Sequence, residues 1–82
     1  MAHYTNVMLE ETLLLTQRIA YNSDGYEQYI GYARPGADES DDQWVIHQLV
    51  YDTSNRMVSK LFAGGSKAFD KRWTERASYE YV

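Results

Sequence analysis

The chain has 82 residues, no cysteine and a formal net charge of −4 at pH 7. A chain of this length forms one small domain that buries only about 60–65% of the surface its unfolded form exposes, and without cysteines it has no disulfide or thiolate–metal site to add stability. The acidic balance excludes non-specific binding to nucleic acid, because phosphate contacts require clustered Lys and Arg. We therefore expect a well-packed core or self-association to supply the remaining stability.

The first element is predicted over residues 7–21, where apolar side chains occupy odd positions. This period of two favours a half-buried strand, although Met8 and Leu14 interrupt the polar face and leave an amphipathic helix over the first part as an alternative. We interpret residues 1–20 as an N-terminal strand or arm that makes an assembly contact. The apolar row of this candidate contact consists of Val7, Leu9, Leu13 and Leu15.

Neither a membrane span nor a secretory signal is expected. The longest apolar run lies near residues 13–15, which is far short of the roughly 20 residues that cross a bilayer. Glu10 and Glu11 occupy positions where a signal peptide has its basic and apolar regions. A short basic cluster over residues 67–76 is interleaved with acidic residues, which predicts a surface of salt bridges.

Two turn signals divide the next part of the chain. The run Asn22-Ser23-Asp24-Gly25 supplies side chains that cap tight turns and a glycine that accepts a positive φ, so we expect a hairpin to a second strand over Tyr26–Ala33. Pro35-Gly36 predicts a type II turn, because Pro fixes φ at the second turn position and Gly accepts the positive φ at the third. Residues 37–43, which include four acidic side chains, then predict a solvated loop.

A second hairpin is predicted from two runs rich in β-branched and aromatic residues, Trp44–Asp52 and Met57–Ala63, which are joined by residues 53–56. Both faces of the first run carry apolar side chains. We therefore expect this strand to be buried on both sides, with one face toward the core and the other toward a neighbouring element or subunit.

The last part of the chain predicts a short helix and a closing strand. Ser66 is a candidate cap for a helix in which Phe69, Trp73 and Ala77 recur every four residues. Residues 78–82 then return to strand-like character, and we expect Tyr79 and Tyr81 to close the sheet edge or to clasp an adjacent chain. The predicted fold is mainly β: a small antiparallel sheet or barrel-like sandwich of about five strands, with one short helix near the C-terminus.

Signals for catalysis and for cofactors are weak. His3 and His47 have no acid–base or metal partner at the usual spacings, so we place His47 on a sheet face and His3 on the terminal arm. Residues 64–67 lack the first glycine of a phosphate loop, and residues 38–42 depart from the calcium-loop pattern. We expect no enzyme activity, no cofactor, no metal and no small-molecule substrate.

The aromatic residues allow two interpretations. Eight tyrosines are too many for so small a core, since each buried hydroxyl needs a hydrogen-bond partner, and they either fill a β core or form an interface. Trp44 and Trp73 lie beside strand and helix signals, which favours a role as core anchors, with Arg76 packed over an aromatic face.

Three segments carry a distinctive order of residues: YIGYARPG at 29–36, W-x-I at 44–46 and FDKRWTERASY at 69–79. This order resembles a group of small virion structural proteins of tailed bacteriophages. The resemblance extends over residues 21–82 and leaves residues 1–20 unmatched. The matching positions are Tyr29, Ile30, Gly31, Ala33, Pro35, Gly36, Trp44, Ile46, Phe69, Asp70, Trp73, Arg76, Ala77, Ser78 and Tyr79.

The resemblance implies a non-enzymatic structural protein present in many copies in the virion, assembled in the host bacterial cytoplasm. Its partners would be further copies and other virion proteins in a neck, tail, fibre-attachment or capsid-decorating position. The motif residues that we expect to determine the fold are Gly31, Pro35, Gly36, Trp44, Trp73 and Arg76. The alternative is a tail or fibre module that binds a host carbohydrate or receptor through Tyr26, Tyr32 and the acidic loop at 38–42.

Overall fold

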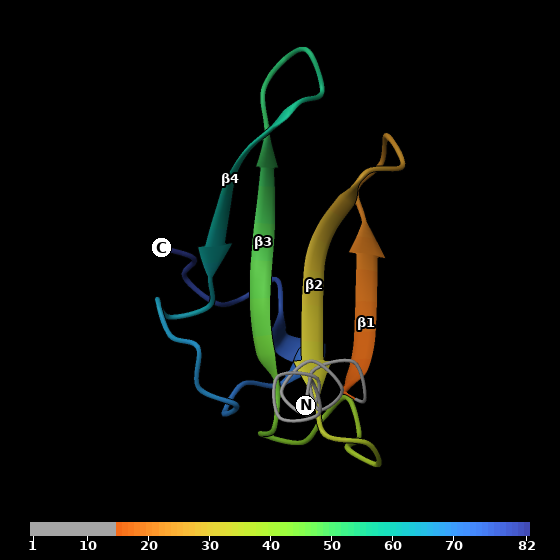
Figure 1. Ribbon diagram of the computed structural model, residues 1–82, viewed down its shortest axis with the longest axis vertical. Coiled ribbons are helices and arrows are strands. Elements are labelled where there is room, and N and C mark those ends of the chain that lie inside the picture. The colour runs from red at the N-terminus through yellow and green to blue at the C-terminus, as the bar shows by residue number, and fades with distance from the viewer. Residues whose placement is uncertain (1–14) are drawn as a thin grey trace, which may run out of the picture.

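The computed structural model describes residues 15–82, which form a four-stranded antiparallel sheet (Figure 1). The strands are β1 (Thr16–Tyr21), β2 (Glu27–Ala33), β3 (Val45–Tyr51) and β4 (Met57–Phe62). Each strand pairs with the next one along the chain, so the sheet is a simple meander. The predicted mainly-β fold is confirmed, with four strands in place of about five.

The core lies on one side of the sheet, which we call the back face. Side chains alternate between the two faces of a strand, and the central strand β3 places Ile46 on this side together with Trp44, which precedes it; both are fully buried. The C-terminal segment, residues 63–82, passes behind β2 and β3 and covers them (Figure 1). Trp73 of this segment packs against Trp44 with their ring centroids 6.0 Å apart.

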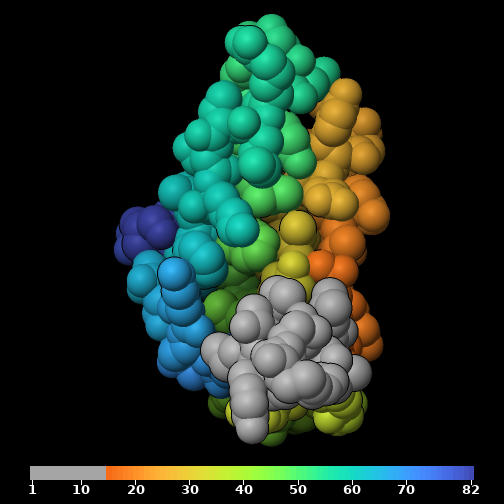
Figure 2. All heavy atoms as spheres, in the orientation of Figure 1, coloured from red at the N-terminus to blue at the C-terminus, as the bar shows by residue number. Residues whose placement is uncertain are grey.

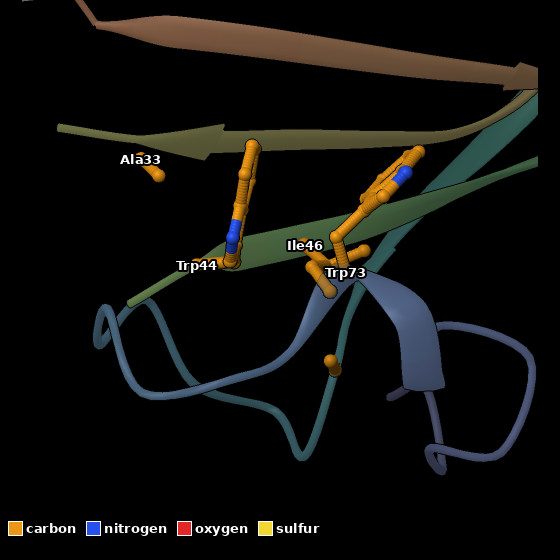
Figure 3. Close-up of a cluster of buried hydrophobic side chains, with 5 residues drawn as sticks. Ala33, Trp44, Ile46 and Trp73 are labelled. Carbon is orange, nitrogen blue, oxygen red and sulfur yellow. The ribbon is translucent and has the colours of Figure 1, made fainter. Parts of the chain in front are cut away.

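Two cations complete the packing of the tryptophans, which lie between the sheet and the C-terminal segment (Figure 3). The guanidinium carbon of Arg76 lies 4.7 Å from the centroid of the Trp73 ring, and that of Arg18 lies 5.8 Å from the Trp44 ring. These distances are within the range of cation–π contacts. The prediction that both tryptophans anchor the core, with Arg76 over an aromatic face, is confirmed.

The short helix predicted after Ser66 is wrong in extent, because only a 3₁₀ turn, η1 (Trp73–Glu75), forms there in the described chain. The backbone before it is held extended. The N–H and C=O groups of Lys71 bond to the C=O and N–H groups of Trp44 at 2.8 and 2.9 Å, and Arg72 has extended φ and ψ angles of −107° and 130°. Pairing with the backbone at the start of β3 therefore overrides the helical spacing of the apolar side chains.

The predicted closing strand is reduced to one short contact with the edge of β4. Tyr81 forms an isolated bridge with Ala63, and Phe62 and Val82 exchange two backbone hydrogen bonds of 3.1 Å. The end of the C-terminal segment is thus attached to the same edge that it was predicted to close, over a stretch too short to count as a strand.

The type II turn predicted at Pro35-Gly36 is present. The N–H group of Ala37 donates to the carbonyl oxygen of Arg34 at 3.2 Å, and Gly36 has a φ of 92°. The acidic loop that follows is exposed but fastened at two points, because Glu39 binds Arg18 at 3.0 Å and Asp42 binds Arg72 at 2.6 Å.

The opposite side of the sheet, which we call the front face, is also apolar. Register and alternation place on it Ile19, Ile30, Tyr32, Val45, His47, Leu49 and Phe62. Val45, His47 and Leu49 are each less than a tenth exposed. The prediction that this strand is buried on both faces is therefore confirmed. Most of the strand predicted to start at residue 7 lies outside the described residues. Within the described residues, β1 begins at Thr16.

Candidate assembly surface

The first hairpin closes with a turn organised by one asparagine. The N–H group of Asn22 donates to the carbonyl oxygen of Tyr26 at 2.8 Å, and its side-chain Oδ1 accepts from the N–H groups of Asp24 and Tyr26 at 3.0 and 2.9 Å. Gly25 takes the left-handed conformation with a φ of 87°. A three-residue loop with a final left-handed residue is a frequent connection between antiparallel strands.

The second hairpin repeats this turn thirty residues later. Asp52 takes the place of Asn22: its N–H group donates to the carbonyl oxygen of Arg56 at 2.9 Å, and its Oδ1 accepts from the N–H groups of Ser54 and Arg56 at 2.9 and 3.0 Å. Asn55 takes the place of Gly25, with a φ of 62°. The strands next to both turns also shift register at equivalent positions. The two halves of the sheet are therefore structurally equivalent hairpins.

Both turns lie at the same end of the sheet, and each has exposed apolar side chains beside it. We define the tip surface as Tyr21, Tyr26, Met57 and Val58. These residues are 60%, 39%, 56% and 59% exposed, and they make up four of the six exposed large apolar side chains in residues 15–82. The hairpin tips form the upper end of the molecule in Figures 1 and 2. The concentration of four of the six at one end of the domain makes this end a candidate contact surface.

Tyr26 of the tip surface packs against a tyrosine of the second hairpin. The ring of Tyr51 lies 5.5 Å from the ring of Tyr26, and its hydroxyl donates to the carbonyl oxygen of Glu27 at 2.7 Å. Tyr51 thereby connects the second hairpin to the first at their tips. A side chain that is already packed, as Tyr26 is, loses little conformational entropy when a partner binds.

Three of the four tip residues, Tyr21, Met57 and Val58, were not predicted as surface contacts from the sequence, because each hairpin was considered separately. The detectable signal was the order Tyr-[Asn/Asp]-[Ser/Thr]-x-[Gly/Asn], which occurs as YNSDG at 21–25 and as YDTSN at 51–55. Each copy supplies a capping oxygen at its second position and a residue that tolerates a positive φ at its fifth.

The tyrosines of the predicted assembly contact lie on the back face. The ring of Tyr81 packs 5.5 Å from that of Tyr29, its hydroxyl donates to the carbonyl oxygen of Arg76 at 2.7 Å, and burial raises the pKa of this tyrosine. The hydroxyl of Tyr79 accepts from the N–H group of Arg72 at 2.8 Å. Both rings pack against the core of their own domain. Of the other contact residues, Leu15 is half-buried, and Val7, Leu9 and Leu13 lie outside the described residues.

The residues weighed for a carbohydrate site are not brought together. Tyr26 precedes β2 at the tip end, whereas the acidic loop at 38–42 follows β2 at the other end (Figure 1). The seven residues of this strand separate them by about 23 Å. Tyr32 lies on the front face, where its hydroxyl accepts a hydrogen bond from Gln17 at 2.9 Å. These groups cannot contact one sugar ring together.

His47 lies on a sheet face, as predicted, between the rings of Tyr32 and Phe62 at 5.9 and 5.5 Å. Burial, with a smaller contribution from the charge of Lys60, lowers its pKa. Within residues 15–82 no group of three or more His, Cys, Asp or Glu side chains is arranged to hold a metal ion. A shallow hollow near Arg34 offers no carboxylate or imidazole among its described lining residues.

No helix in the described part of the chain is long and apolar enough to cross a membrane. Comparison with family models, curated proteins and solved structures finds no match to this chain.

Proposed function

We propose that this protein is a non-enzymatic structural component of a tailed-phage particle that acts by multicopy assembly. It would occupy a neck, tail, fibre-attachment or capsid-decorating position. The observation that carries the proposal is the tip surface. Four apolar side chains lie exposed on two equivalent, well-fastened hairpins, and a partner that covers them removes this apolar area from water.

The residues that carry the phage resemblance and the residues of the tip surface occupy separate parts of the fold. Gly31, Trp44, Trp73 and Arg76 build the back-face core, and Pro35-Gly36 makes the turn after β2. None of them belongs to the tip surface. The motif residues therefore account for the scaffold, and the contact with a partner is left to the hairpin tips.

The proposal is tested by removing apolar groups from the tips. We expect the variant Tyr21→Ser/Met57→Ser to keep its fold, because both side chains are more than half exposed. Its association, followed by sedimentation velocity over a concentration series, should weaken at least about tenfold, since buried aromatic and methionine anchors contribute much of an interface's affinity. Phe69→Ser is the matched control: Phe69 is 46% exposed but lies outside the tip surface, and its replacement should leave association unchanged.

A second measurement covers contacts with other virion proteins. Particles purified from an infected culture should contain the protein in many copies by quantitative mass spectrometry, and particles carrying the tip variant should contain less of it. Absence of the protein from purified particles, or equal incorporation of both forms, would overturn the proposal.

A further inference from the structure

Strands β1 and β4 form the two edges of the four-stranded sheet (Figure 1). Tyr21 at the end of β1, and Met57 and Val58 at the start of β4, are each more than half exposed. These apolar side chains therefore lie at the same end of the sheet but on opposite edges. A contact that covers both groups at once joins the β4 edge of one molecule to the β1 edge of another.

Within the chain, a contact of this kind already joins the two hairpins. The first strand of the second hairpin, β3, pairs with the second strand of the first, β2. At the end of β3, the ring of Tyr51 packs on that of Tyr26, and its hydroxyl donates to the carbonyl oxygen of Glu27 at 2.7 Å. The edge of β2 thus receives a strand that ends in a tyrosine.

The outer edge of β4 corresponds to this edge of β2. The turns that close the two hairpins are related by an offset of thirty residues, which makes β4 the counterpart of β2 and β1 the counterpart of β3. The strand that fits the outer edge of β4 is therefore β1 of a second copy. The corresponding positions are Tyr26 and Arg56, Glu27 and Met57, and Tyr51 and Tyr21.

Backbone groups at the outer edge of β4 are available toward the hairpin tips. Residues of an antiparallel strand turn their N–H and C=O groups alternately to one neighbour and to the other. Phe62 bonds outward to Val82, whereas Ala63 donates to Ile46 of β3, so Lys60 also turns its backbone groups outward. The described residues place no strand beside Lys60.

The outer edge of β1 offers matching backbone groups. Alternation carried across the sheet register turns those of Gln17 outward, where the described residues again place no strand. The pairing of Ile30 with His47 between β2 and β3 becomes, at the same offset, the pairing of Lys60 with Gln17 of the second copy. A register shift near the start of β4 does not prevent this pairing, because β2 has the same shift and still pairs with β3 beyond it.

Charge favours contact between unlike hairpins. Residues 16–33 contain two acidic residues and one basic residue, whereas residues 45–62 contain one acidic and two basic residues. The first hairpin is thus net negative and the second net positive at pH 7, with His47 neutral. Opposite charges of this kind steer association and select the partner surface.

We infer that the β4 edge of one molecule pairs with the β1 edge of a second copy, with Tyr21 of that copy seated beside Arg56 and its hydroxyl at the carbonyl oxygen of Met57. A guanidinium beside an aromatic ring is a favourable contact. The contact is heterologous, so a dimer keeps one β1 edge and one β4 edge open, and further copies extend it into a ring or an open chain. Head-to-tail pairing rests on the proposed function for its premise that copies associate, and it names the surfaces that meet.

Complementation between two variants tests the head-to-tail geometry. Tyr21→Ser impairs only the β1 edge and Met57→Ser only the β4 edge, so each protein alone should associate at least about tenfold more weakly than the native chain. In an equimolar mixture, sedimentation velocity should show dimers of native affinity, because one intact edge of each kind is present. The mixture should stop at dimers, since the edges left open are impaired.

The absence of recovery in the mixture would overturn the inference. Association that depends on the tips would then use another geometry, such as contact between two β4 edges, and the proposed function would stand. A native chain that stays monomeric over the whole concentration series would also overturn the inference, whereas the content of purified particles tests the proposed function separately.

Engineered cysteines test the register in protein with native tips. The chain has no cysteine, so Gln17→Cys and Lys60→Cys each introduce a single thiol. In the proposed register these positions lie opposite each other with Cα atoms about 5.5 Å apart, a distance that a disulfide can span. Within one molecule they are separated by three strand spacings, about 14 Å, which a disulfide cannot span.

Mild oxidation of a mixture of the two single-cysteine proteins, one of them isotopically enriched, should give mainly the mixed dimer by mass spectrometry. With Thr53→Cys, which lies in the second turn, in place of Lys60→Cys, the mixed dimer should form at least about tenfold more slowly, because this thiol is not held opposite Gln17→Cys. Equal rates for the two mixtures would indicate random collision, and a preference of Lys60→Cys for itself would indicate contact between two β4 edges. Either result would contradict head-to-tail pairing.

Discussion

Gly31 lies where the two tryptophan rings meet the sheet. A Cβ atom at this position would lie 2.6 Å from Cε3 of Trp73 and 3.2 Å from Cε3 of Trp44. The ring that must give way is a rigid, buried group, so the added methyl cannot be accommodated by a flexible side-chain end. We expect Gly31→Ala to lower the free energy of unfolding by about 1–3 kcal/mol, measured by urea denaturation.

A double-mutant cycle tests the cause of this loss. In the background of Trp73→Phe, whose smaller ring leaves space over Gly31, the added methyl should cost less than it does in the native chain. An equal cost in both backgrounds would show that the effect arises from the backbone of β2 and not from contact with Trp73.

At the scale of the elements, the two equivalent hairpins differ in the charge of their capping residue. Hydrogen bonds from the backbone N–H group of Arg56, from that of Ser54 and from the Arg56 guanidinium lower the pKa of Asp52. A carboxyl group whose pKa is lower in the folded chain than its unfolded value of about 3.9 stabilises the fold above that pH. This contribution is lost as the pH falls through the lowered pKa. Asn22 has no such dependence.

We therefore expect Asp52→Asn to copy the first hairpin and to remove an acid-sensitive contribution. Near pH 7 the native chain should be the more stable of the two, because the carboxylate accepts charge-assisted hydrogen bonds. The difference in urea midpoint between the two proteins should shrink as the pH is lowered below about 4. A difference that stays constant from neutral to acidic pH would assign the stabilisation to the shape of the turn alone.

The elements that the sequence predicted well are those decided by local chemistry. Asn22 to Gly25 and Pro35-Gly36 identify turns because capping oxygens and a positive φ are requirements of the backbone itself, and alternation then places β2, β3 and β4. The prediction of a helix after Ser66 was wrong because the backbone of Lys71 pairs with that of Trp44, a residue that is distant in the sequence. Spacing of side chains along a short segment carries no information about such a contact.

The candidate surface was harder to predict for a related reason. Apolar character alone does not separate Tyr81, which packs on Tyr29, from Tyr21, which is exposed. The distinction depends on which face each residue occupies and on what covers that face. Only the repeated turn sequence pointed to the tips, and it becomes informative once both hairpins are known to lie side by side.

At the scale of the whole molecule, the fold depends on one segment that lies behind the sheet. Residues 63–82 contribute Trp73 to the core and form backbone hydrogen bonds with several residues that are distant in the sequence. Lys71 bonds to Trp44, the N–H group of Thr74 donates to the carbonyl oxygen of Glu39 at 3.1 Å, and Val82 pairs with Phe62. Without residues 63–82 the back face would expose Trp44 and Ile46, both of which are fully buried in the intact chain.

The sheet and this segment should therefore behave as two halves of one cooperative unit. We expect a fragment of residues 1–62 to be unfolded alone, with poorly dispersed amide NMR signals, because a sheet that loses the cover of its hydrophobic core has too little apolar burial to offset chain entropy. Addition of a peptide of residues 63–82 should restore the native dispersion. A peptide with Trp73→Ala should fail to do so at equal concentration, since it lacks the side chain that packs on Trp44. Native dispersion of the fragment without any peptide would show instead that the meander is stable by itself and that the C-terminal segment only covers it.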